Sequence, residues 1–147
     1  MASLVPNAFK GRLFGDDSIA STAINLKTDT LKLSLHSASF APTVEMDFFS
    51  DLTNEVSSSG TYTAGIAGGY TLTQTISTND TSDRGILDAT DVSITGATII
   101  ARYAVIRKDT GVAGTSPIVC IVDLGSNITS TAGTFAITWD SAGIMYL

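Results

Sequence analysis

Few residues of this chain have the types and spacing that catalysis or metal binding needs. The 147 residues include one histidine, His36, and one cysteine, Cys120. A single histidine rules out a multi-histidine metal site and leaves only one base for a Ser–His–acid triad. His36 lies on the polar side of an alternating segment, so we expect a solvated surface histidine. Cys120 lies in an apolar run, which predicts a buried and unreactive thiol.

The tripeptide Asp109-Thr110-Gly111 matches the signature of aspartic proteases, in which two aspartates share one proton. A homodimer could supply the second aspartate. In the protease pattern apolar residues precede the Asp, whereas here Arg107 and Lys108 do, and no matching apolar-apolar-glycine segment follows. Asp, Thr and Gly are also common in hairpin loops. We therefore expect a loop here, with a dimeric aspartic-type protease as a weaker alternative.

An acidic cluster is the last candidate for chemistry, and it consists of Asp80, Asp83, Asp88 and Asp91. Carboxylate oxygens can bind calcium, but this spacing is not that of an EF-hand loop. A turn-rich, solvated loop accounts for the cluster equally well. We therefore expect no catalytic residues, no metal site and no cofactor, and a protein that is not an enzyme.

The elements that would position these residues centre on Thr98 to Leu124. Two runs rich in Val and Ile, 99–106 and 118–124, flank a polar segment with glycines at 111 and 114. β-branched residues favour strands, and runs that are apolar on both faces are typical of strands covered on both sides. The runs predict an antiparallel hairpin with a loop longer than two residues.

Shorter alternating segments predict further strands at 30–36, 70–76, 92–94, 134–139 and 144–147, with a polar loop at 125–133. In the first of these, Leu31, Leu33 and Leu35 share one face, which indicates a half-buried strand. Residues 43–53 are the best helix candidate, because Thr43 can cap and Glu45 and Asp47 fall in the first turn. The pattern favours an all-β, mainly antiparallel fold. We expect a β-sandwich or jelly-roll-like barrel of six to eight strands with one short helix, as a single domain over residues 21–147.

Residues 1–20 are expected to form an N-terminal arm or short element. One or two helical turns, a short edge strand, or an arm that docks on a neighbouring subunit all fit this stretch. The adjacent rings at 48 and 49 suggest a subunit interface, because a short helix cannot easily turn both inward, although burial of both remains open. The candidate interface residues are Phe9, Leu13, Phe14, Phe48 and Phe49.

Composition narrows the classes of partner. Charged residues make up 15% of the chain, below the usual share of about 25%, and the net charge is −6 with a pI near 4.4. An acidic chain poor in Lys and Arg argues against nucleic-acid binding. The mean hydropathy of +0.28 is high, yet no apolar run approaches the ~18–20 residues of a membrane helix. The first residues lack the apolar core of a signal peptide.

Several segments together resemble a family of small structural proteins encoded by tailed bacteriophages. They are INLKTDTLKLSLHSASFAPT (24–43), FFSDLTNEVSSSGTYTAG (48–65), LDATDVSITGATIIARYAVIRKDTG (87–111) and GTFAITWDSAGIMYL (133–147). The Asp-Leu-Thr-Asn-Glu-Val segment, the strand ending in Arg-Lys-Asp-Thr-Gly and the strand ending in Thr-Trp-Asp carry the likeness. Members are described as virion or head-associated proteins, so the resemblance implies a virion location more than a mechanism.

We expect a capsid decoration (cement) protein, made in the host cytoplasm, that binds the outer surface of the phage head. Its expected partner is the major capsid protein, and its Thr- and Ser-rich strands could pair with partner strands at an edge. We expect a homo-oligomer, with a trimer matching the three-fold positions of a capsid lattice. The alternative is a tail or fibre component that binds a receptor or glycan.

Overall fold

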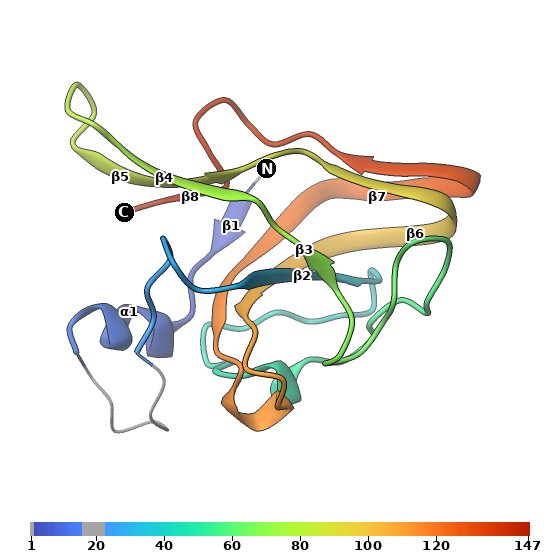
Figure 1. Cartoon of the computed structure of the whole chain (residues 1–147), viewed down its shortest axis with the longest axis horizontal. Helices are drawn as coiled ribbons and strands as arrows, with labels where there is room; N and C mark the ends of the chain where they lie inside the picture. Colours follow the sequence, from blue (N-terminus) through green and yellow to red (C-terminus); the bar gives the residue numbers. More distant parts are fainter. Residues whose placement is uncertain (1, 16–22) are drawn as a thin grey trace.

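The computed structural model describes residues 2–15 and 23–147, which form two antiparallel sheets (Figure 1). The first sheet has the order β1 (Ala2–Leu4), β7 (Ile118–Ile137), β6 (Val92–Lys108), β2 (Leu31–His36) and β3 (Tyr70–Thr71). The second has the order β4 (Gln74–Asn79), β5 (Arg84–Ala89) and β8 (Met145–Tyr146). The expected antiparallel sandwich is confirmed. The sheets do not close into a barrel, so the jelly-roll-like alternative is not formed.

The central hairpin is confirmed and is longer than expected. β6 and β7 pair from Val92 with Ile137 down to Arg107 with Ile118. The predicted loop at 125–133 is wrong, because β7 runs through it as strand. Register shifts along the ladder accommodate the glycines there, and Gly125 adopts a φ of +84°. Bulges of this kind let one strand continue where the sequence suggests an interruption.

Each face of the first sheet is covered by a different layer. On the inner face, the three leucines of β2 join residues of the second sheet, such as Leu87 and Met145, in the main core. On the outer face, residues 37–56 pack over the sheet, and Phe40 lies against Val105, Ile118 and Ile121. β2 is therefore buried on both faces. The expectation of a half-buried strand is wrong because the sequence pattern does not show that a later segment covers the polar side.

The helix expected over residues 43–53 is also wrong. Only the 3-10 turn η1 (Phe49–Asp51) forms there. A carboxylate oxygen of Asp51 accepts hydrogen bonds from the N–H groups of Asp47 and Phe48, at 2.8 and 2.9 Å. Phe48 stays extended and forms a single β-bridge with Pro117, which a helix through this residue would not allow. A neighbouring strand that offers backbone partners thus overrides a weak helical pattern.

The α-helix of the structure lies in the N-terminal arm. β1 pairs with β7, and α1 (Asn7–Leu13) follows it. Both the short-strand and the helical interpretations of this stretch are therefore confirmed, while residues 1 and 16–22 lie outside the described part. Figure 1 shows α1 and the β6–β7 connection, which contains the 3-10 turn η2 (Ala113–Thr115), at the same end of the molecule. None of the helices in the described residues is long and apolar enough to cross a membrane.

Candidate functional site

His36 is buried, so the expectation of a surface histidine is wrong. Its exposed fraction is 0%. Nδ1 donates to the carbonyl oxygen of Thr53 at 2.7 Å, and Nε2 lies 2.9 Å from the hydroxyl oxygen of Ser34. Nδ1 therefore carries the proton, and the neutral ring accepts the Ser34 hydroxyl at Nε2. Burial lowers the pKa of His36 below its usual value. With both nitrogens bonded inside the fold, this ring positions residues 37–56 over the sheet.

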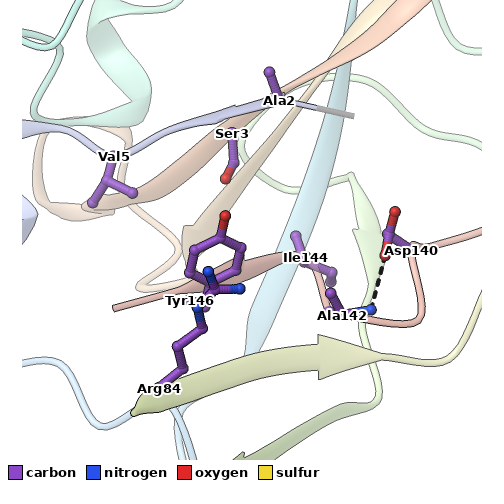
Figure 2. Close-up of a pocket in the computed structure, with 9 residues that line it drawn as sticks. Ala2, Ser3, Val5, Arg84, Asp140, Ala142, Ile144 and Tyr146 are labelled. Atoms are coloured by element: carbon purple, nitrogen blue, oxygen red, sulfur yellow. Dashed lines mark hydrogen bonds between the residues drawn. The ribbon is translucent and has the colours of Figure 1, made fainter. Parts of the chain in front are cut away.

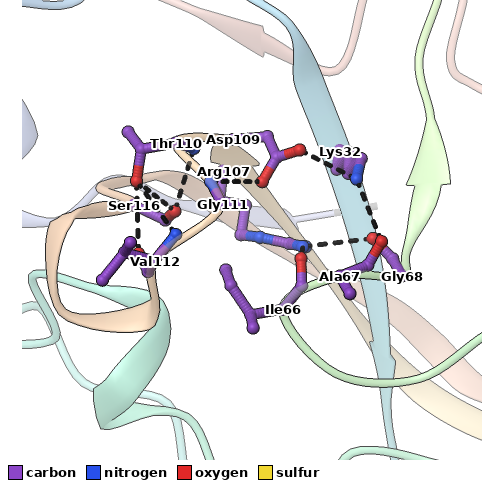
Figure 3. A network of polar contacts seen from close by, with 10 residues as sticks. All are labelled: Lys32, Ile66, Ala67, Gly68, Arg107, Asp109, Thr110, Gly111, Val112 and Ser116. Atoms are coloured by element: carbon purple, nitrogen blue, oxygen red, sulfur yellow. Dashed lines mark hydrogen bonds and ion pairs between the residues drawn. The ribbon is translucent and has the colours of Figure 1, made fainter.

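Asp109 lies in a tightly bonded loop (Figure 3). Its carboxylate pairs with Lys32 at 2.8 Å and accepts a hydrogen bond from the N–H of Gly111 at 3.2 Å. The Thr110 hydroxyl lies 2.9 Å from that of Ser116 across the loop. Partial burial opposes ionisation of Asp109, but its hydrogen bonds to Lys32 and Gly111 and the positive charges of Lys32 and Arg107 together outweigh this and hold the carboxyl pKa below its usual value. An aspartic protease needs a carboxyl that shares a proton, whereas this environment favours the ionised form.

Arg107 on β6 anchors the glycine-rich segment around Ile66 and Gly68 to the first sheet. The side chain is fully buried, and Nη2 donates to the carbonyl oxygens of Ile66 and Gly68 at 2.9 and 3.2 Å (Figure 3). Its guanidinium lies 4.4 Å from the centre of the Phe49 ring. A Cβ at Gly69, where φ is +87°, would lie 3.1 Å from Nη1. The glycine thus leaves room for the buried arginine.

The two adjacent phenylalanines of the sequence are each covered by an arginine. The Arg12 guanidinium lies 4.9 Å from the centre of the Phe48 ring, as Arg107 does over Phe49. Both rings are half-buried. The faces of aromatic rings attract cations, which accounts for this arrangement without a partner subunit. Nothing in the spacing of the sequence pairs these rings with arginines.

The remaining interface candidates lie on α1 or, in the case of Phe14, directly after it, and they divide into buried and exposed side chains. Phe9 is 0% exposed and belongs to the main core, so its ring does not face outward. Leu13 is 46% exposed and Phe14 is 93% exposed. The N–H of Asn7 donates to the carbonyl oxygen of Val44 at 2.8 Å, which fixes the start of the helix. The helix is therefore held at one end by Phe9 and presents two apolar side chains to solvent at the other.

A polar cleft opens between the two sheets where their edge strands β1 and β8 lie. Its volume is about 540 Å³. Figure 2 shows the hydroxyls of Ser3 and Tyr146 pointing toward one another across it, with Arg84 beneath the Tyr146 ring. The Arg84 guanidinium lies 3.9 Å from the centre of that ring. Asp140 stands at one side of the cleft and accepts the N–H of Ala142 at 2.8 Å.

The cleft is not apparent from the sequence. Ser3, Arg84 and Asp140 come from widely separated parts of the chain. No local spacing signals that they meet, and the sheet topology alone brings them together.

The remaining candidates for chemistry have structural roles or are dispersed. Burial raises the pKa of the Cys120 thiol to about 12, as expected of an unreactive cysteine. Asp91 accepts the backbone N–H of Trp139 at 3.0 Å, and Asp88 accepts the N–H of Ala89 at 2.8 Å. Within residues 2–15 and 23–147, no three His, Cys, Asp or Glu side chains gather as a metal site would require.

We compared the chain with family models, curated proteins and solved structures, and none of the three comparisons returned a match.

Proposed function

We propose that the chain is a non-enzymatic structural protein of a phage virion, a decoration protein that binds the outer head surface and stabilises contacts between major capsid subunits. The resemblance of residues 24–43, 48–65, 87–111 and 133–147 to phage structural proteins supports the virion location. The acidic charge of −6 suits an outer surface, away from the packaged DNA.

The observation that carries the binding role is the exposed ring of Phe14. A phenylalanine that is 93% exposed costs solubility unless a partner covers it. Phe9 fixes α1 to the core, so the ring is presented from an anchored helix and a partner need not order the whole arm. Leu13, which is 46% exposed, extends the apolar surface beside it. In the proposed complex these two side chains fill a pocket on the capsid subunit.

The test is a binding assay on expanded phage heads that lack the protein. Wild-type protein is expected to bind in several hundred copies per head, counted from gels. Phe14→Ser should weaken binding about tenfold or more, because loss of a central aromatic anchor costs most of the energy of a small interface. Ile100→Ser is the matched control, since Ile100 is 56% exposed on β6 and outside the arm. Equal binding of all three proteins, or a handful of copies at one vertex, would overturn the proposal.

The proposed assembly is a trimer of the chain at three-fold positions of the capsid lattice. Closed symmetry lets one small contact be repeated many times, so modest contacts give a stable shell. Sedimentation of the purified protein tests this part, with a monomer at all concentrations as the contrary result.

The cleft between β1 and β8 supports a second candidate function, that of a tail or fibre component that binds a receptor or glycan. A polar cleft of about 540 Å³ has the size of a small-ligand site. The copy number on virions separates the two functions, because a tail component is present at one vertex only.

A further inference from the structure

The cleft between β1 and β8 contains an arginine whose hydrogen-bond donors are not used. Arg84 stacks on Tyr146 at 3.9 Å, and no hydrogen bond or ion pair to its side chain occurs within the described residues. On the first sheet, by contrast, Lys32 and Lys108 are each paired with a carboxylate. A planar guanidinium held by a ring presents its N–H fork in a fixed direction, and that fork matches a carboxylate.

Hydroxyl and carboxylate groups surround this fork. The side-chain hydroxyls of Ser3 and Tyr146 point into the cleft (Figure 2) and have no partner within the described part of the chain. Asp140 uses one oxygen, Oδ1, for the N–H of Ala142 and leaves the other available as an acceptor. Groups that both donate and accept at short range are what a ligand rich in hydroxyls requires.

The rest of the lining is apolar and small. Val5, Ala142 and Ile144 form walls against which C–H groups can pack. A volume of about 540 Å³ leaves space for a ligand of one or two sugar rings. A purely apolar ligand would leave Arg84 and Asp140 desolvated without partners, which is costly.

We propose that this cleft binds a saccharide that carries a carboxylate, such as a uronic acid, with Arg84 pairing the carboxylate and Ser3, Tyr146 and Asp140 binding hydroxyls. The ring of Tyr146 holds Arg84 in place from one side, so the sugar contacts the free N–H edge of the guanidinium. This binding is separate from head attachment, because the cleft and Phe14 lie on different elements.

The experiment is an NMR titration of the whole chain with trigalacturonate, and with maltotriose as a neutral trisaccharide of similar size. Trigalacturonate is expected to shift the amide signals of cleft residues such as Ser3, Gly143 and Ile144, while maltotriose leaves them unchanged. Arg84→Gln should weaken trigalacturonate binding about tenfold or more, since it removes a charge-assisted bidentate pair. Arg84→Lys keeps the charge without the fork and is expected to bind with intermediate affinity.

The matched control is Lys27→Gln, which removes the same charge at an exposed residue outside the cleft. It should bind as the wild type does. Three results would overturn the proposal: no shift of cleft signals with trigalacturonate, equal shifts with maltotriose, or equal weakening by Lys27→Gln and Arg84→Gln. The titration uses free protein, so its outcome is read separately from that of the head-binding assay.

Discussion

The face around His36 and Arg107 and the cleft around Arg84 both hold polar side chains against apolar walls, but their hydrogen bonds differ. His36 bonds to Thr53 and Ser34, and Arg107 to the carbonyls of Ile66 and Gly68. The hydroxyls and guanidinium of the cleft have no such partners within the described residues. The hydrogen bonds of the first region therefore hold residues 37–69 in place, although Nε and Nη1 of Arg107 are buried without a hydrogen-bond partner among the described residues. The polar groups of the second region are available for a ligand.

The same comparison explains why the two regions should respond differently to mutation. Where a buried group already has a partner, removing it leaves that partner unsatisfied, and the free energy of unfolding falls. Where a group faces water, removing it leaves nothing unsatisfied, and stability changes little. Stability measurements on paired variants test whether the two regions differ in this way.

The largest effect is expected for Arg107→Ala. The change leaves two buried carbonyl oxygens without a donor and a void beside Phe49. The free energy of unfolding should fall by about 3 kcal/mol, measured by urea denaturation. A loss below about 0.5 kcal/mol would mean that Arg107 does not hold the segment around Ile66 and Gly68 in place.

The next effect is expected for Tyr62→Phe. The Tyr62 hydroxyl accepts the N–H of Leu35 at 3.0 Å and donates to Glu55 at 2.8 Å. Its loss leaves a buried N–H unsatisfied, so unfolding should become easier by about 1.5 kcal/mol. Tyr146→Phe removes the same hydroxyl group from the cleft and should change stability by less than about 0.5 kcal/mol. Equal losses in the two variants would contradict the distinction.

A pH-dependent effect is expected at His36. Burial lowers its pKa, so the unfolded chain binds a proton more readily than the folded one. The stability contributed by the neutral ring is complete above the unfolded pKa of about 6.5 and is lost as the pH falls from there through the folded pKa. Denaturation between pH 7.5 and 5.5 should show a decline for the wild type that is flatter in His36→Gln. Parallel curves would mean that the pKa of His36 is the same in the folded and unfolded chain.

The smallest effect on stability is expected for Arg84→Gln. This arginine stacks on a half-exposed ring and makes no ion pair within the described residues. Thermal and urea unfolding should match the wild type to within about 0.5 kcal/mol, while binding of trigalacturonate falls. A larger loss would place Arg84 with the structural residues and remove the contrast between the two regions.

The central hairpin could be predicted from sequence because its signal is local and strong. Runs 99–106 and 118–124 are apolar on both faces, and a two-faced apolar run has few alternatives to a covered strand. By contrast, the alternation at 30–36 shows which residues share a face but not what covers it. Residues 37–56 pack over Ser34 and His36, and this tertiary packing is not visible in the local sequence pattern.

The predicted helix at 43–53 does not form and the cleft was not predicted, for related reasons. Asp51 can accept backbone N–H groups at the start of a 3-10 turn as well as of a longer helix. Here Pro117, which is distant in sequence, pairs with Phe48 and keeps the chain extended. The cleft takes Ser3, Arg84 and Tyr146 from three separate strands. Only the strand order brings them together, and the order depends on pairing between distant segments.

Electron microscopy of phage heads with bound protein tests most directly the proposal that many copies of this chain cover the head. We expect density for the chain repeated across the lattice at three-fold positions, with α1 and the Phe14 ring that follows it against the capsid surface. Density confined to the tail or to one vertex, or a lattice contact made without α1, would contradict it.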